Sequence, residues 1–191
     1  MSSPLKQRVL DTADTLFYAE GIRAVGIDRI IEESGIAKAS FYRFFASKDA
    51  LITEWMEMRD AAWRHWLEES VDLLAPDPSN RPLAVFDAIY ARFRNPAFRG
   101  CAFQNTMVEL ARVDHPAAIA ARGHKAAVIS LLKRYLTEAG YESTADELAL
   151  QFMQLIDGAL ITAVREQRPD AALRAKQMAT MLLREAGPLR L

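Results

Sequence analysis

Residues 35–48 decide the fold, and they read Gly35-Ile36-Ala37-Lys38-Ala39-Ser40-Phe41-Tyr42-Arg43-Phe44-Phe45-Ala46-Ser47-Lys48. Gly35 can adopt the positive φ of a tight turn at no steric cost, and Ile36 supplies an apolar anchor for that turn. Helical periodicity predicts a short helix that ends near Gly35 and another over about residues 37–45. Two short helices joined by such a turn are typical of a helix-turn-helix, whose second helix enters the major groove of DNA.

The second helix of this pair has an apolar face and a polar face at 100° per residue. The residues expected to pack inward are Ala37, Phe41, Phe44 and Phe45. The residues expected to face outward are Ala39, Tyr42 and Arg43, flanked by Lys38 and Ser40. The outward side chains are short, hydroxyl-bearing or positive, so they can reach base edges and phosphates without a repelling charge. The alternative from this pattern alone is a solvated amphipathic helix with ordinary surface charges.

Three basic side chains give the segment a local positive charge, since it contains Lys38, Arg43 and Lys48 and no acidic residue. Lys38 and Arg43 would contact phosphate or guanine. Lys48 lies at the start of the next expected helix, where backbone N–H groups also favour phosphate. A basic edge of this kind indicates DNA binding through a local patch.

The uncharged outward residues have roles in the same hypothesis. Tyr42 would donate its hydroxyl to a phosphate, and Ser40 would reach either a phosphate or a base edge. Ala39 would touch a thymine methyl group.

Composition excludes several other classes of protein. The chain has 191 residues, is 51% hydrophobic and carries a net charge of −1, which excludes wholesale disorder and a binder that works by global basicity. Its single cysteine, Cys101, cannot form an internal disulfide or a cysteine-built metal site. The N-terminus lacks the apolar core of a signal peptide, and polar residues interrupt the apolar stretch 148–164. We therefore expect a cytoplasmic protein with no membrane association.

The rest of the chain is also helical in its periodicity. We expect an all-α fold of about nine helices, with residues 1–47 as the DNA-binding domain and residues 48–191 as a helical effector-binding and dimerisation domain. Ser47 is expected to cap a long helix, and Thr144 with Glu147 forms a predicted capping box.

The sequence resembles the tetracycline-repressor (TetR) family of bacterial transcriptional regulators. The resemblance covers about the first quarter of the chain and lies in residues 8–21, in residues 27–30 and in residues 34–51. Its most specific part is the series Leu-Phe…Gly, Gly-Ile, Tyr-x-x-Phe and Ser-Lys-x-x-Leu, all in the family's register. The chain departs from the family at Val25-Gly26, where a hydroxyl cap is frequent, and at Ala37 and Phe44, where serine and histidine are frequent.

The resemblance implies a homodimer that binds a pseudo-palindromic, double-stranded DNA operator and a C-terminal body that binds an effector. The family's DNA-contact positions correspond to Lys38, Ala39, Ser40, Tyr42, Arg43 and Lys48.

The second part of the chain is rich in aromatic residues. Most of these are expected to be ordinary core, but a pocket between helices for a small hydrophobic effector is the sharper hypothesis. The residues expected to line this pocket are Trp63, Trp66, Phe86, Tyr90, Phe103, Met107 and Phe152. An aromatic or planar effector would suit them.

Small and apolar residues dominate the last two expected helices. Two such helix pairs related by a two-fold axis would form a four-helix interface, which is also where the family dimerises. Packing within one chain is the competing interpretation.

Catalytic and metal sites have no support in the sequence. The three histidines are far apart, and no phosphate-binding loop, nucleophile elbow or zinc-protease motif is present. We expect no catalytic residue, no metal and no cofactor. Cys101 precedes a short helix, so a redox or electrophile sensor is conceivable there, although a small apolar side chain is the plainer interpretation.

Together these features predict a ligand-responsive, dimeric transcriptional repressor that a small hydrophobic effector releases from DNA. The alternatives are an all-helical ligand-binding or scaffold protein without specific DNA binding and, more remotely, a helical enzyme.

Overall fold

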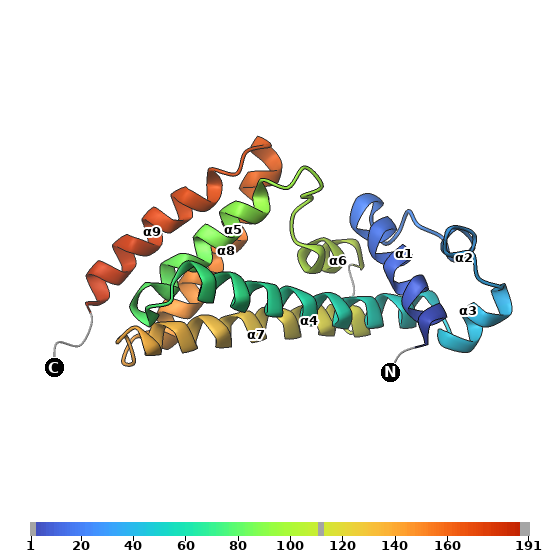
Figure 1. The fold of residues 1–191 in the computed structure, drawn as a ribbon, viewed down its shortest axis with the longest axis horizontal. Coiled ribbons are helices and arrows are strands. Elements are labelled where there is room, and N and C mark those ends of the chain that lie inside the picture. Colours follow the sequence, from blue (N-terminus) through green and yellow to red (C-terminus); the bar gives the residue numbers. More distant parts are fainter. Residues whose placement is uncertain (1–2, 111–112, 188–191) are drawn as a thin grey trace. The chain divides into compact units, whose positions relative to one another are not determined.

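The computed structural model describes residues 3–110 and 113–187, and within these ranges its regular secondary structure is all helical (Figure 1). The helices are α1 (Pro4–Glu20), α2 (Ile27–Ser34), α3 (Lys38–Phe44), α4 (Lys48–Leu74), α5 (Arg81–Phe93), α6 (Ala102–Leu110), α7 (Pro116–Glu138), α8 (Ala145–Glu166) and α9 (Ala171–Ala186). A 3-10 turn at Pro78–Asn80 precedes α5. The prediction of an all-α fold with about nine helices is confirmed.

The chain forms two compact units. Unit 1 contains the described residues of Met1–Ala61 and Cys101–His124, and unit 2 contains those of Ala62–Gly100 and Lys125–Leu191. Helices α4 and α7 each contribute residues to both units. Unit 1 thus adds the start of α4, all the described residues of α6 and the start of α7 to the three N-terminal helices.

In unit 1, the apolar faces of α1, α2 and α3 share one core with the first half of α4. Phe17 of α1 and Trp55 of α4 are buried there with their ring centroids 5.1 Å apart. Asp14 of α1 accepts a hydrogen bond of 2.6 Å from Trp55 Nε1 and forms an ion pair with Arg59. Because this contact combines burial with a charge-assisted bond, it fixes α1 firmly to α4.

The turn and the caps around α3 follow from single residues. Gly35 ends α2 in the left-handed region with φ +63°, as expected for a tight helix-helix turn. Ser47 Oγ accepts a hydrogen bond of 3.1 Å from Ala50 N, so the predicted cap of α4 is confirmed. The turn at Gly35 sets where α3 begins, and the cap at Ser47 sets where α4 begins.

In unit 2, α5, α8 and α9 form an apolar core with the remaining parts of α4 and α7. Phe86 and Phe152 are fully buried in it, with ring centroids 5.4 Å apart. Lys176 Nζ of α9 lies 2.6 Å from Asp87 Oδ2 of α5, and further ion pairs join neighbouring helices. Small side chains, mostly alanine, allow these helices to approach closely.

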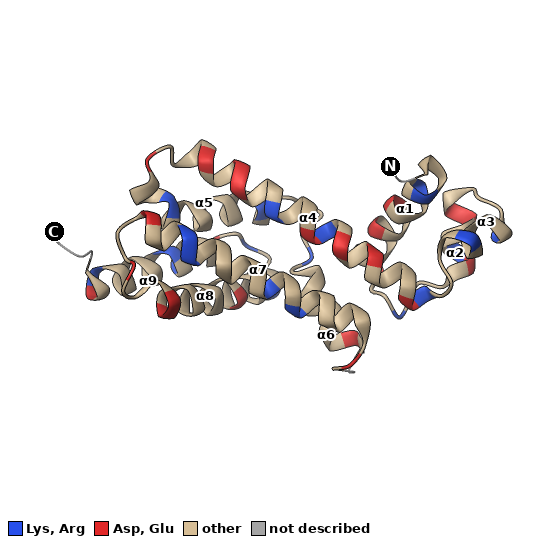
Figure 2. Cartoon of the chain, turned by 90° about the horizontal axis from the view of Figure 1, so that it is seen from below, with Lys and Arg blue, Asp and Glu red and all other residues tan. Residues whose placement is uncertain are grey.

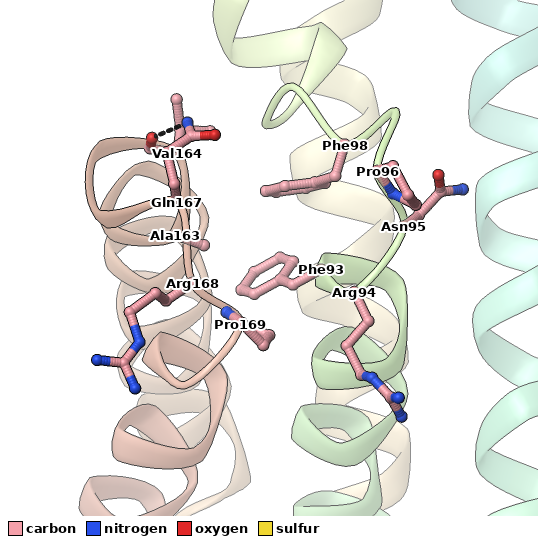
Figure 3. A pocket seen from close by; sticks show the side chains of 10 residues that line it. All are labelled: Phe93, Arg94, Asn95, Pro96, Phe98, Ala163, Val164, Gln167, Arg168 and Pro169. Carbon is pink, nitrogen blue, oxygen red and sulfur yellow. Dashed lines mark hydrogen bonds between the residues drawn. The ribbon is translucent and has the colours of Figure 1, made fainter.

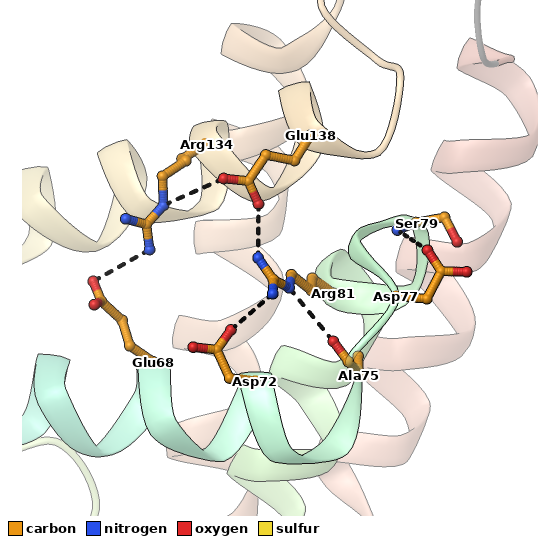
Figure 4. Close-up of polar contacts among 8 residues, drawn as sticks. All are labelled: Glu68, Asp72, Ala75, Asp77, Ser79, Arg81, Arg134 and Glu138. Carbon is orange, nitrogen blue, oxygen red and sulfur yellow. Dashed lines mark hydrogen bonds and ion pairs between the residues drawn. The ribbon is translucent and has the colours of Figure 1, made fainter.

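Arg81, the first residue of α5, anchors the end of α4 to α7 (Figure 4). Its guanidinium group lies 3.1 Å from Asp72 Oδ1 and 3.0 Å from Glu138 Oε2, and its Nε donates to Ala75 O at 3.4 Å. One partner on α4, one directly after it and one on α7 restrict the geometry of the α4–α5 connection more than one surface ion pair would.

The predicted capping box at the start of α8 is wrong. Thr144 has φ −119° and ψ 0°, and its side chain makes no cap hydrogen bond. The hydroxyl donates instead to Tyr141 O at 3.4 Å, while Glu147 accepts from Gln151 Nε2. The local turn therefore takes the hydroxyl away from the helix N-terminus.

Helix α8 has the length and mean hydropathy of a membrane-spanning helix. Eight of its residues are buried in the unit 2 core, which explains its apolar character. Length and composition alone are therefore weak evidence for a membrane span here.

Candidate nucleic-acid interface

Helix α3 presents a polar face to solvent and buries its aromatic face. Phe41 is fully buried, whereas the neighbouring Tyr42 is 47% exposed and Arg43 is also exposed. Lys38 and Ala39 are exposed, and the side chain of Ser40 is half-buried. The division of α3 into two faces therefore matches the helical spacing in the sequence.

One inward assignment is wrong, because Ala37 is exposed. Ala37 has φ −68° and ψ 141° and precedes the first helical residue, so the rotation of 100° per residue does not apply to it. Phe45 is buried as expected, and Phe44 is half-buried. The Arg43 guanidinium lies over the Phe44 ring, 5.1 Å from its centroid.

Lys38 is paired with an acidic residue of the preceding helix. Its Nζ lies 2.8 Å from Asp28 Oδ1 of α2, and this hydrogen bond is the main reason that the pKa of Lys38 is raised. Both side chains are largely exposed. A phosphate that binds Lys38 must therefore compete with Asp28, a residue that the sequence analysis did not identify.

Other charges on α2 hold the helix in place. Figure 2 shows that α2 carries both acidic and basic residues. Arg29 of α2 donates to Glu20 of α1 at 2.5 and 2.8 Å and to Glu33 at 2.7 Å. These bonds raise the pKa of Arg29, and the bond from Arg29 lowers the pKa of Glu20. Arg29 therefore serves the packing of α2 on α1.

Lys48 stands at the first position of α4, next to the Ser47 cap. Its side chain is half-buried, and burial lowers its pKa, while Asp49 and Glu109 act in the opposite direction. A partly desolvated ammonium group gains from a phosphate partner, because the phosphate replaces lost hydration. Lys48 is the least accessible of the basic residues assigned to DNA.

The seven residues predicted to line an effector pocket divide between the two units. Phe86, Trp63, Trp66, Tyr90 and Phe152 belong to unit 2; Phe86 and Phe152 are fully buried, and the other three are partly buried against the same core. The Trp63 and Trp66 rings are in edge contact, with centroids 5.8 Å apart.

The other two predicted lining residues, Phe103 and Met107, lie on α6 in unit 1. Phe103 is buried and stacks on the imidazole of His124, with ring centroids 3.6 Å apart and planes 8° apart. Met107 is partly buried against the unit 1 core. The effector pocket stays a prediction.

A cavity of about 320 Å³ in unit 2 lies where α5 and α8 end (Figure 3). The Phe93 and Phe98 rings line it with centroids 4.6 Å apart, and Arg94 and Arg168 extend on its two flanks (Figure 3). None of the seven predicted residues lines this cavity. Trp66 borders a different groove of about 390 Å³ on α4 and α5.

Cys101 is half-buried directly before α6, and its side chain packs against the unit 1 core. Its carbonyl accepts a hydrogen bond of 3.0 Å from Asn105 N. In residues 3–110 and 113–187, the structure contains no group of three or more histidine, cysteine, aspartate or glutamate side chains that could hold a metal ion.

Helices α8 and α9 leave large apolar side chains in solvent. Ile161 of α8 is 65% exposed, and Met178 and Met181 of α9 are 53% and 68% exposed. A groove of about 230 Å³ between the two helices is bordered by Leu155, Gly158 and Met178 among others. Exposed apolar residues on adjacent helices are typical of a protein–protein contact.

Known regulators match this chain over both units. Residues 9–54 match the family described as "Bacterial regulatory proteins, tetR family". Residues 78–180 match "Transcriptional regulator LmrA/YxaF-like, C-terminal domain". The first match contains α2 and α3, and the second contains α5 and α8.

Similar proteins and structures are also described as transcriptional regulators. The HTH-type transcriptional regulator YxaF of Bacillus subtilis is 24% identical over 185 residues, which is 95% of this chain and 96% of the relative. The HTH-type transcriptional repressor NemR of Escherichia coli is 24% identical over 139 residues, which is 72% and 69% of the two chains. The crystal structure of SCO4454, a TetR-family regulator from Streptomyces coelicolor, is 30% identical, has a TM-score of 0.86 and covers 96% of this chain and 90% of its own. The protein therefore belongs to the TetR family of bacterial transcriptional regulators.

Proposed function

We propose that the protein is a homodimeric transcriptional repressor in which each α3 reads one half of a pseudo-palindromic operator. The observation that carries this proposal is the exposed face of α3, where Tyr42, Arg43 and Lys38 reach solvent while Phe41 is buried. Phosphate contacts would position the protein, and contacts to base edges would give sequence preference. The similarity to the repressor NemR supports repression. As a regulator of DNA it would act in the cytoplasm.

The contacts of individual residues follow from their chemistry. Arg43 would form a bidentate contact with guanine or bind a phosphate, and Lys38 would bind a phosphate after leaving Asp28. Tyr42 and Ser40 would donate hydroxyl hydrogen bonds, and Ala39 would contact a thymine methyl group. Lys48 would bind a phosphate at the start of α4.

Dimerisation would use the exposed apolar residues of α8 and α9. Pairing the two helices with those of a second copy would bury Ile161 and Met181 and form a four-helix interface. A dimer is also what a two-fold operator requires, because each copy supplies one recognition helix.

Effector control would work by a population shift. A small hydrophobic, planar molecule bound among the predicted pocket residues of unit 2 would favour a dimer in which the two α3 helices no longer match major grooves about 34–36 Å apart. The aromatic character of Trp63, Trp66 and Tyr90, all partly buried, supports this choice of ligand class.

Fluorescence anisotropy tests DNA recognition with labelled duplexes from the DNA that flanks the protein's own gene. The wild type and the double variant Tyr42→Ala, Lys48→Ala are compared over a salt series. We expect tight binding to one fragment that is weakened by salt and by the variant. Equal, weak binding to every fragment would favour a ligand-binding or scaffold protein instead.

Alanine substitutions test the effector pocket. We expect Trp66→Ala and Tyr90→Ala, both in unit 2, to weaken the binding of a planar aromatic probe such as 2-naphthol, measured by calorimetry. Arg168→Ala serves as the control, because Arg168 lies outside the predicted pocket. Unchanged affinity in both alanine variants would remove the pocket assignment.

A further inference from the structure

A carboxylate of α6 binds the turn between α1 and α2. Glu109 Oε2 accepts a hydrogen bond of 3.0 Å from the backbone N of Arg23. The two residues are 86 positions apart in the sequence, and both belong to unit 1. This turn leads directly into α2, the first helix of the helix-turn-helix.

Gly21 lies close to this carboxylate. A Cβ atom built on Gly21 would lie 2.9 Å from Glu109 Oε1 and 3.0 Å from Oε2, so a larger residue would require the carboxylate to shift. Gly21 also has φ +91°, a backbone conformation that other residues rarely adopt. Glycine at this position therefore does more than end α1: it leaves room for a side chain from α6.

Glu109 lies in the last described turn of α6, and its side chain is half-buried. The Arg23 N–H group therefore gives this carboxylate a partner from another part of unit 1.

The opposite end of α6 is also held in place within unit 1. Phe103 stacks on His124 of α7, and His124 Nδ1 lies 2.7 Å from Asp60 Oδ1 of α4. Helix α6 is therefore fixed to α4 and α7 near its start and to the α1–α2 turn near its end. A turn anchored in this way limits the movement of α2, which packs against α3 in the unit 1 core through Ile30 and Phe41.

We propose that Glu109 is a positioning residue for DNA recognition: its carboxylate fixes the α1–α2 turn and thereby holds α2 and α3 in the orientation that binds DNA. The inference rests on the proposed function of α3. It assigns to Glu109 no contact with DNA, since the carboxylate would repel phosphate. The turn is fixed by the acceptor oxygen of the Glu109 side chain, and the negative charge of Glu109 contributes less.

Two substitutions at one position separate the acceptor from the charge. Glu109→Gln keeps an acceptor oxygen and removes the charge, whereas Glu109→Ala removes both. Glu57→Ala is the matched control, because Glu57 is an exposed acidic residue of unit 1 outside this contact. Each variant is measured by anisotropy on the fragment that the wild type binds, by hydrogen exchange of the peptide containing Arg23, and by thermal unfolding.

We expect Glu109→Ala to lower the affinity for the operator about tenfold and to speed exchange at Arg23, with the melting transition still cooperative. Glu109→Gln should stay within about twofold of the wild type in both measurements. Glu57→Ala should change neither the hydrogen exchange at Arg23 nor the affinity for the operator.

Two results would overturn the inference while leaving the proposed function intact. One is operator affinity in Glu109→Ala equal to that of the wild type. The other is an equal loss in Glu109→Gln and Glu109→Ala, which would assign the effect to charge. A wild type that binds no DNA fragment would instead defeat the proposed function, and with it any role of Glu109 in recognition.

Discussion

Helix α3 and the α8–α9 pair both leave side chains in solvent, but the chemistry of these side chains is opposite. Helix α3 exposes Lys38, Tyr42 and Arg43, whereas α8 and α9 expose Ile161 and Met181. A polar and positive face suits a polyanion, and an apolar face suits another apolar surface. The comparison indicates that the partner of each region can be inferred from what that region leaves unburied.

The largest expected effect separates two neighbours on α3. Phe41→Ala should destabilise the protein by about 3–5 kcal/mol, because it removes a fully buried ring. Tyr42→Ala should change stability by less than about 1 kcal/mol while weakening DNA binding, because Tyr42 is exposed. Urea unfolding followed by circular dichroism measures both variants. Similar losses of stability would mean that the two faces of α3 are not distinct.

The next effect concerns the apolar face of α8. Ile161→Glu should raise the dissociation constant of the dimer at least about a hundredfold, because a carboxylate would be buried between the copies. Sedimentation velocity over a concentration series measures it. Leu73→Glu is the control, since Leu73 is 83% exposed on α4 outside the α8–α9 pair. Dissociation by Leu73→Glu alone would move the interface away from α8 and α9.

A smaller effect is expected from the acidic partner of Lys38. Asp28→Asn should tighten DNA binding about threefold, because it frees Lys38 and removes a charge that repels phosphate. Anisotropy at low salt measures the change. Asp146→Asn provides the comparison in unit 2, where Asp146 Oδ1 lies 2.6 Å from Lys133 Nζ in a similarly exposed pair. An equal gain in both variants would attribute the effect to net charge alone.

The smallest effect concerns pH. The hydrogen bond from Arg29 lowers the pKa of Glu20 in the folded protein. The Glu20–Arg29 pair therefore stabilises the fold fully above the pKa of an unfolded glutamate, and this stabilisation is lost as the pH falls through the lowered pKa of folded Glu20. Glu20→Gln should therefore lower the melting temperature slightly at pH 7, and this effect should shrink as the pH falls through the lowered pKa of Glu20.

A matched pair for this pH test exists in unit 2. Arg174 lowers the pKa of Glu166 in the same way, so Glu166→Gln should show the same pH dependence. Calorimetry between pH 3 and 7 measures both variants. A loss of stability that is as large at pH 3 as at pH 7 would contradict the assignment to these ion pairs.

Local patterns in the sequence predicted the parts of this fold that depend on local physics. The glycine turn at Gly35, the cap at Ser47 and the two faces of α3 each involve residues within a few positions of one another. Helical spacing and capping preferences describe such features directly. The errors were also local: Ala37 and Thr144 stand just outside their helices, where backbone angles decide the outcome.

Contacts between distant segments could not be predicted from periodicity. Asp28 pairs with Lys38 across the turn, and Glu109 reaches Arg23 from another helix. Nothing in the spacing of charged residues distinguishes these pairs from other acidic and basic residues on exposed faces. The division of the chain has the same origin, since residues of α6 join unit 1 only through tertiary packing.

Hydroxyl-radical footprinting of the bound DNA fragment tests most directly the central claim that a dimer reads DNA with two α3 helices. We expect two protected half-sites related by a pseudo-two-fold axis, with centres about one helical turn, or a multiple of it, apart. Both protected half-sites should disappear together in the double variant Tyr42→Ala, Arg43→Ala. They should persist in Arg168→Ala, which removes a positive charge from unit 2. A single protected half-site, or protection that survives the loss of Tyr42 and Arg43, would contradict the account.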